Sequence, residues 1–179
     1  MPWIILDRDG VINEDSDAYI KSPDEWIPIP GSLEAIASLK RRGFQIAVLT
    51  NQSGIARGLF DLSTLEKIHA KMVAAIEAAG GGIDALFYCP HGPEDNCDCR
   101  KPRSGLFQAF QAQYQVDLAN VPAIGDSLRD LQAAEAVGAS PMLVETGKGR
   151  KTIKRHPELD VPTFENLHAA AQYILFQQA

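Results

Sequence analysis

The sequence predicts an α/β fold with three layers, in which a mainly parallel sheet carries helices on both faces. Short apolar runs alternate with stretches of helical periodicity, which indicates parallel strands joined by right-handed crossovers. The runs are continuous rather than alternating, as in strands buried on both faces. Polar residues follow the runs directly, so we expect them to gather at the carboxyl edge of the sheet, where such folds bind ligands.

The first quarter of the chain predicts two strands and one helix. The apolar run Trp3 to Leu6 is expected to be the first strand. Residues 10–31 are irregular and contain three prolines, which favours a flap-like loop. A helix is expected to begin with Ser32 as its N-cap and to end at Gly43, and residues 44–49 form the second predicted strand.

Two further helices and a strand are expected in the middle of the chain. Ser63 and Glu66 have the spacing of a capping box, and the helix that they begin should end at the glycines 80–82. Residues 83–88 are the third predicted strand. Ser104 is expected to cap the helix that follows.

The remaining part of the chain continues the alternation. Residues 121–124 and 141–144 are the fourth and fifth predicted strands, with a helix over about 128–137 between them. A closing helix is expected over about 165–177. The segment Gly147 to Lys151 lacks the spacing of a nucleotide P-loop, so we expect a solvated loop there.

Composition excludes several classes of protein. The chain has 179 residues, of which 45% are hydrophobic and 22% charged, as expected for one globular domain over residues 1–179. Its net charge of −6 is unfavourable for binding nucleic acid or an anionic membrane surface. The sequence contains no recognisable signal peptide and no run of transmembrane length. We therefore expect a cytoplasmic monomer that binds neither nucleic acid nor membrane.

Acidic residues follow two of the predicted strands. Asp7 and Asp9 are two positions apart, so in an extended backbone both carboxylates face one side while Arg8 faces the other. Two like charges at one place need compensation by a proton or a cation. Mg²⁺ binds such carboxylates and shares phosphate oxygens, and Asp126 at the end of the fourth strand is the natural third ligand.

Four motifs in order give the chain a resemblance to the haloacid dehalogenase superfamily of phosphatases. They are Asp7-Arg8-Asp9-Gly10-Val11, Leu49-Thr50-Asn51, Arg100-Lys101-Pro102 and Gly125-Asp126-Ser127-Leu128-Arg129-Asp130. The resemblance implies a Rossmann-like fold without a separate cap domain. It also implies that Asp7 is the nucleophile and Asp9 the general acid and base, while Thr50 hydrogen-bonds the phosphoryl group and Lys101 neutralises it. Mg²⁺ is implied at Asp7, Asp9 and Asp126, and we expect Asp130 to support the site by orienting Lys101 or a metal-bound water.

A second group of ligands lies in one loop. Cys89, His91, Cys97 and Cys99 supply the four N and S ligands of a structural Zn²⁺ site, and a disulfide between Cys97 and Cys99 would be strained. This loop leads into Arg100 and Lys101. It resembles the zinc loop of a subgroup of the superfamily, the heptose bisphosphate and histidinol phosphatases. That resemblance implies a zinc-stiffened loop that aims the two basic side chains at the substrate.

Substrate recognition is expected to come from the flap and from basic residues near it. A small phosphorylated sugar, the heptose bisphosphate, is the substrate that the resemblance implies, as a step toward nucleotide-activated heptose for lipopolysaccharide or related glycoconjugates. The residues expected to bind it are Asp15, Ala18, Asn51, Ser53, Arg57, Arg100 and Lys101. His69 has no partner pattern and is interpreted as a surface or helix-packing residue.

Two alternatives remain open at this level. Histidinol phosphate has an amine in place of the second phosphate, and Glu14, Asp15 and Asp17 could accept that amine. A zinc-stabilised binding module without catalysis would be the alternative from another class, but the complete set of motif residues argues against it.

Overall fold

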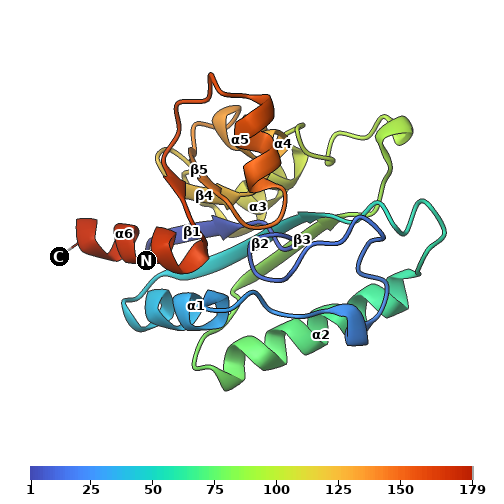
Figure 1. Cartoon of the computed structure of the whole chain (residues 1–179), viewed down its shortest axis with the longest axis horizontal. Coiled ribbons are helices and arrows are strands. Elements are labelled where there is room, and N and C mark those ends of the chain that lie inside the picture. The colour runs from blue at the N-terminus through green and yellow to red at the C-terminus, as the bar shows by residue number, and fades with distance from the viewer. Residues whose placement is uncertain (179) are drawn as a thin grey trace.

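Six parallel strands form one sheet in the order β3-β2-β1-β4-β5-β6 in the computed structural model, which describes residues 1–178 (Figure 1). This confirms the predicted fold class and parallel topology. The strands are β1 (Trp3–Leu6), β2 (Gln45–Asn51), β3 (Ala85–Cys89), β4 (Pro122–Gly125), β5 (Ser140–Val144) and β6 (Thr163–Phe164).

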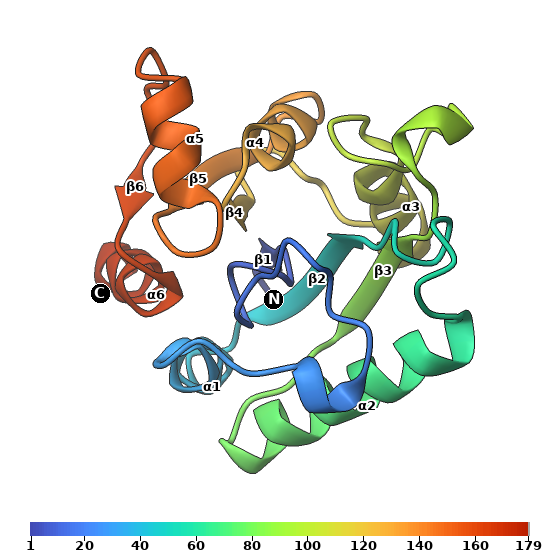
Figure 2. The ribbon, with the colours of Figure 1, turned by 45° about the vertical axis from the view of Figure 1, so that its right-hand side comes forward.

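Helices cover both faces of this sheet (Figure 2). One face packs against α1 (Ser32–Arg41), α2 (Leu62–Ala78) and α6 (Leu167–Gln177), and the other against α3 (Gly105–Tyr114) and α4 (Leu128–Glu135). The short helix α5 (Gly149–Arg155) and two 3₁₀ turns, Pro23–Glu25 and Pro93–Asp95, complete the described elements. No described helix has both the length and the apolar character that crossing a membrane requires.

The strand β1 lies in the middle of the sheet and is buried along its whole length. It pairs with β2 from Trp3 to Leu6 and with β4 at Ile5 and Leu6. Ile4 and Leu6 face one apolar core while Ile5 faces the other, and burial of each such side chain contributes roughly 1.5–3 kcal/mol. The N–H of Asp7 donates to the carbonyl of Ile124 at 3.0 Å, so the first motif is fixed beside the last one.

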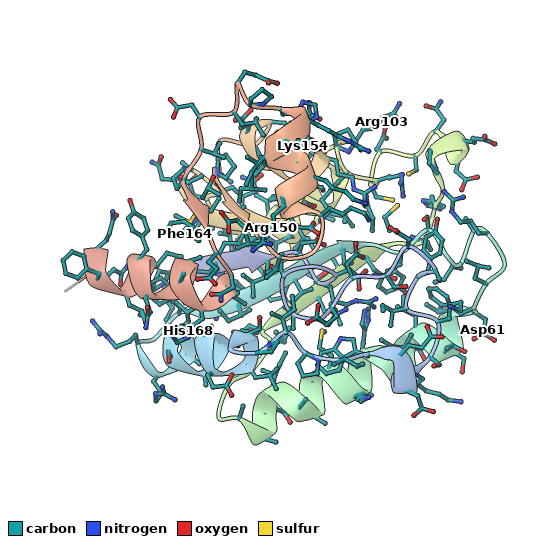
Figure 3. The ribbon with its side chains drawn as sticks, in the orientation of Figure 1. Asp61, Arg103, Arg150, Lys154, Phe164 and His168 are labelled. Atoms are coloured by element: carbon teal, nitrogen blue, oxygen red, sulfur yellow. The ribbon has the colours of Figure 1, made fainter. Side chains whose placement is uncertain are left out.

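Two predicted helix caps are wrong by one or two residues. Gly31 caps α1 with φ of 89°, and Ser32 Oγ instead donates to the carbonyl of Val11 at 2.8 Å, which ties the helix to the loop after β1. Asp61 caps α2 by accepting from the N–H of Thr64, in place of the predicted box of Ser63 and Glu66 (Figure 3). A carboxylate is as good a cap as a hydroxyl, so the sequence offered two competing starts.

The predicted solvated loop over residues 147–151 is also wrong. It leads into α5, which is anchored because Thr152 Oγ1 donates to the main-chain carbonyl of Asp126 at 2.8 Å. A Cβ at Gly149 would collide with the carbonyl oxygen of Val144, so this helix packs directly on the end of β5. The helix α5 could not be predicted from the sequence, because it has only seven residues and begins among glycines. Tertiary contacts rather than intrinsic helix propensity stabilise a helix of this length.

Candidate active site

A cavity of about 240 Å³ lies at the carboxyl edge of the sheet, where the loops after β1, β2 and β4 meet. Its lining includes most of the predicted site residues, namely Asp7, Asp9, Asp15, Asn51, Ser53, Arg57, Arg100, Lys101, Asp126 and Asp130. Thr50 is buried outside the lining, and Ala18 is exposed on the flap. The site lies beside β1, the strand at which the strand order reverses, as expected for this architecture.

Three carboxylates meet at one point of this cavity. Oxygens of Asp7, Asp126 and Asp130 all lie within 4.8 Å of one another. Lys101 Nζ lies 3.1 Å from Asp7 Oδ1 and 2.7 Å from Asp130 Oδ1. Among the described residues, Lys101 is the cationic side chain that forms ion pairs with these carboxylates. Burial and then the charge of Asp130 raise the pKa of Asp7 to about 7, and the same two causes raise the pKa of Asp126. The cluster therefore holds more negative charge than Lys101 can balance.

This excess of buried negative charge fits a hard divalent cation. Mg²⁺ binds carboxylate oxygens and keeps open positions for phosphate oxygens, which matches a cavity lined by Asp7 and Asp126. Asp126 also has the close surroundings that a ligand held in one position needs. A Cβ at Gly10 or Gly147 would collide with its carboxylate, and its Oδ2 accepts from the N–H of Lys148 at 2.8 Å.

The raised pKa of Asp7 predicts that protons compete with Mg²⁺. Between the ordinary value of 3.8 and about 7 the folded protein holds a proton that the unfolded chain releases, so metal-free stability falls as the pH rises through this range. Bound Mg²⁺ should displace that proton and remove the loss of stability. We expect Mg²⁺ to bind more tightly at pH 8 than at pH 6 and to release protons on binding at pH 6. Calorimetric titration in two buffers of different ionisation heat measures the release, and pH-independent binding without proton release would contradict this prediction.

Lys101 is held from three sides. Its Nζ donates to the carbonyl of Leu49 at 2.8 Å, in addition to the two carboxylates. The Asn51 amide holds the main chain of Lys101, because Nδ2 donates to the Lys101 carbonyl at 3.1 Å and Oδ1 accepts from its N–H at 3.0 Å. Asn51, predicted to bind substrate, therefore uses its amide to position Lys101. Burial opposes the charge of Lys101, but Asp130 and Asp7 outweigh it and raise the pKa of Lys101, so the group is an ammonium ion.

Asp130 has the position that the predicted orienting role requires. Its Oδ2 accepts from the N–H groups of Asp126 and Ser127 and from Ser127 Oγ, at the first turn of α4. Burial opposes ionisation of Asp130, but the charge and hydrogen bond of Lys101 lower the pKa of Asp130 to about 2. Asp130 is thus the ionised partner of Lys101 at neutral pH.

Asp9 lines the same cavity as Asp7, but it is not one of the three carboxylates that meet there. The chain turns between Arg8 and Asn13, because the N–H groups of Ile12 and Asn13 donate to the carbonyl of Arg8. Arg8, which was expected to face away, is bonded to Asp9 Oδ1 through Nε at 3.0 Å and Nη2 at 2.7 Å. Burial opposes ionisation of Asp9, but Arg8 and the hydrogen bonds that Asp9 accepts lower its pKa.

The zinc loop brings its four predicted ligands together. The ligand atoms of Cys89, His91, Cys97 and Cys99 lie within 4.8 Å of one another, and none of the cysteines forms a disulfide. Cys89 Sγ lies 3.7 Å from Cys97 Sγ and 2.8 Å from Cys99 Sγ, so the thiols are gathered where one Zn²⁺ could bind them. Arg100 follows the loop and donates to the carbonyl of His91 at 3.4 Å, so the cluster and the cavity are directly connected.

Removal of zinc should loosen this loop and lower activity while Asp7 stays reactive. The residues between β3 and α3 contain only one short 3₁₀ turn, so the metal is expected to supply much of their order. Hydrogen exchange over residues 89–103 should accelerate after chelation of zinc and restoration of Mg²⁺, with a lower rate of phosphate release. Unchanged protection of the loop after verified loss of zinc would contradict this role.

The basic side of the cavity is defined by three guanidinium groups in its lining that lie near one another, those of Arg57, Arg100 and Arg129. The guanidinium group of Arg57 lies 5.5 Å from the centre of the Tyr19 ring, and its Nε donates to Ser53 Oγ at 3.4 Å. Burial and then the charge of Arg129 lower the pKa of Arg100, which indicates that these two guanidinium groups are neighbours. This side of the cavity therefore offers a second place for an anion.

Several lining residues were missed by sequence reasoning. Gln52 donates to Asp9 Oδ2 and to Thr50 Oγ1, and it directly follows the second motif. Arg129 stands inside the fourth motif without an assigned role. Lys148 pairs with Asp15 at 3.3 Å, so Asp15, predicted to bind substrate, also ties the flap to the segment before α5. The sequence signal for Lys148 was only the glycine-flanked loop.

A family model for haloacid dehalogenase-like hydrolases matches residues 3–138. The chain belongs to this family. The predicted membership is thereby confirmed, and so is the expectation of a hydrolase rather than a zinc-stabilised binding module.

Two highly similar relatives of this haloacid dehalogenase-like hydrolase share one name. The chain is 56% identical over 177 residues to the D-glycero-beta-D-manno-heptose-1,7-bisphosphate 7-phosphatase of Bordetella bronchiseptica, covering 98% of both chains. It is 51% identical to the enzyme of the same name from Pseudomonas putida, covering 98% of this chain and 100% of the relative.

Solved structures give the same result. The crystal structure of the D,D-heptose 1,7-bisphosphate phosphatase from B. bronchiseptica, complexed with magnesium and phosphate, has a TM-score of 0.96 at 55% identity and full coverage of both chains. The corresponding enzyme from Burkholderia thailandensis has a TM-score of 0.78 at 43% identity, covering 98% of this chain and 99% of that one.

Proposed function

We propose that the chain hydrolyses the 7-phosphate of D-glycero-D-manno-heptose 1,7-bisphosphate with Mg²⁺, through an aspartyl-phosphate intermediate. The observation that carries this proposal is the position of Asp7, which lies at the end of the central strand with Lys101 Nζ 3.1 Å from its Oδ1. The names of the relatives support the substrate, and they specify its beta anomer. The product would be the heptose 1-phosphate from which a nucleotide-activated heptose is made.

In the first step a carboxylate oxygen of Asp7 attacks the phosphorus in line as the bond to the sugar oxygen breaks. Asp9 in its protonated form gives its proton to the leaving oxygen, so that an alcohol departs rather than an alkoxide. Lys101 neutralises the phosphoryl oxygens and stays charged because Asp130 is ionised beside it.

In the second step a water attacks the phosphorus of the aspartyl-phosphate. The Asp9 carboxylate takes the proton of this water, the bond to Asp7 breaks, and phosphate leaves. Asp7 is then a free carboxylate again and Asp9 is protonated again, so each turnover consumes one water and needs no other reactant.

Asp7, Asp126 and the main-chain carbonyl of Asp9 are the proposed holders of Mg²⁺. The carboxylate of Asp9 is engaged by Arg8, Asn13 and Gln52, whereas its carbonyl oxygen accepts no hydrogen bond from the described residues. Bound Mg²⁺ would offset the repulsion between the Asp7 carboxylate and the phosphate dianion.

Arg57 and Arg100 are the proposed ligands of the second phosphate, on the basic side of the cavity. This charge distribution favours the bisphosphate over histidinol phosphate, because a cationic amine would face guanidinium groups there. Asp15, one of the three acids that could have received the amine, is paired with Lys148. Ser53 and the flap residue Ala18 would complete the contacts to the sugar.

We further propose that residues 1–179 act as one phosphatase domain without a separate cap, as a monomer in the cytoplasm. The single sheet and the direct opening of the cavity at its carboxyl edge support the first part. The three unpaired thiols support a reducing compartment.

Phosphate release from both anomers of the heptose bisphosphate and from histidinol phosphate, each with Mg²⁺, tests this function. We expect the beta anomer of the bisphosphate to have the highest kcat/KM. A preference for histidinol phosphate would overturn the proposed substrate and leave the mechanism standing. Release from none of the three would overturn the substrate class.

A further inference from the structure

Arg8 and His69 form a buried pair next to Asp9 that the proposed mechanism has not used. The side chain of Arg8 is completely buried, with 0% of its surface exposed, and His69 on α2 is 6% exposed. Arg8 Nη1 lies 3.1 Å from His69 Nε2. The two residues are 61 positions apart in the sequence, so only the fold brings them together.

Donor chemistry fixes the state of this histidine. A guanidinium group has only donors, so Nε2 of His69 must accept the hydrogen bond and the ring must be neutral, with its proton on Nδ1. Burial and then the charge of Arg8 lower the pKa of His69 to about 3, which agrees with this assignment. His69 is therefore a fixed acceptor rather than a group that exchanges protons during turnover.

The other two arms of Arg8 hold one oxygen of Asp9. Nε and Nη2 both donate to Oδ1, and Asn13 Nδ2 donates to the same oxygen at 2.9 Å. Oδ2 accepts one hydrogen bond from the part of the chain that the structure describes, from Gln52 Nε2 at 3.0 Å. Because three N–H groups saturate Oδ1, a proton on Asp9 must reside on Oδ2.

We propose that His69 is a positioning residue for proton transfer by Asp9, acting through Arg8. His69 fixes the third arm of the guanidinium group, which sets the plane of the other two and keeps Oδ1 occupied. The Oδ2–H bond then breaks as the proton passes to the leaving oxygen, while His69 and Arg8 keep their own protons. This inference rests on the proposed role of Asp9 as general acid.

Leaving groups of different basicity test the inference. A sugar oxygen needs a proton as it departs, whereas p-nitrophenolate does not, so loss of the general acid lowers kcat/KM selectively for the sugar phosphate. His69→Phe keeps the size of the ring and removes the acceptor, and we expect kcat/KM to fall about tenfold or more for the heptose bisphosphate but less than about threefold for p-nitrophenyl phosphate. His69→Gln retains an acceptor oxygen and should restore most of the difference. Arg8→Lys, which keeps the charge and loses the three-armed geometry, should reproduce the selective loss.

Two controls separate this role from structural damage and from the proposed function. Met72→Ala alters another buried position of α2 and should lower the melting temperature without a selective loss. Asp9→Asn should give the largest selective loss, and its absence there would overturn the role of Asp9 itself. A selective loss in Asp9→Asn together with equal losses on both substrates in His69→Phe and Arg8→Lys would overturn the positioning role. If wild-type protein prefers another alkyl phosphate, the same comparison is made with that ester.

Discussion

Replacement of Asp7 by asparagine is expected to lower kcat by a factor on the order of 10⁴ or more, because an amide cannot form the acyl-phosphate bond. The fold should survive this change. Asp7 is a buried acid with a pKa raised to about 7, so its ionised form costs stability at pH 8 in the absence of a cation. The metal-free Asp7→Asn protein should therefore be at least as stable as the wild type at pH 8.

Rapid acid quench with labelled substrate measures the covalent step directly, since label should stay on wild-type protein and be absent from Asp7→Asn. Asp17→Asn is a matched control, because Asp17 also lines the cavity but has no ion pair in the described structure. We expect that variant to retain activity within about tenfold. Phosphate release by Asp7→Asn at a rate near that of the wild type would refute the assignment of the nucleophile.

Substitution of Lys101 by methionine should have the second largest effect. Methionine fills a similar volume but leaves Asp7 and Asp130 without their buried counter-charge. Loss of a preorganised cation at the phosphoryl oxygens is expected to lower kcat by about 10²–10³-fold. Removal of one partner from a buried ion pair should also destabilise the fold by about 3–5 kcal/mol, measured by denaturant unfolding.

The double variant Lys101→Met with Asp130→Asn distinguishes these two effects. The amide introduced by Asp130→Asn would retain an acceptor for the N–H groups of Asp126 and Ser127 while removing the unpaired charge. We expect stability to recover in the double variant and activity to remain low. Recovery of both would mean that Lys101 acts on folding alone.

Patterns local in sequence predicted most of the framework. Continuous apolar runs marked β1 and β2 because both faces of these central strands are buried. The polar residues after β1 and β4 marked the site, since parallel strands bring their carboxyl ends to one edge. Element ends were less predictable, as Gly31 and Asp61 illustrate, because neighbouring residues competed to cap the same helix.

Contacts between distant segments could not be predicted from the same patterns. The guanidinium group of Arg8, which is paired with Asp9, also contacts a buried acceptor on α2, and nothing near His69 in the sequence indicates that contact. Lys148 lies at the site because α5 packs on the end of β5. The composition of residues 147–151 did not indicate that packing. Residues with a direct role in catalysis or metal binding were thus easier to identify from the sequence than the residues that position their side chains.

The central place of β1 has a consequence for how the chain acquires its activity. This strand is synthesised before the other five described strands, yet Ile5 and Leu6 find their β4 partners only at Ala123 and Ile124. Until those residues have left the ribosome, one edge of an apolar strand is without a neighbour and is open to association with other chains. The nucleophile comes directly after that strand, so catalytic competence is a late event in folding, governed by pairing across most of the chain rather than by local structure around Asp7.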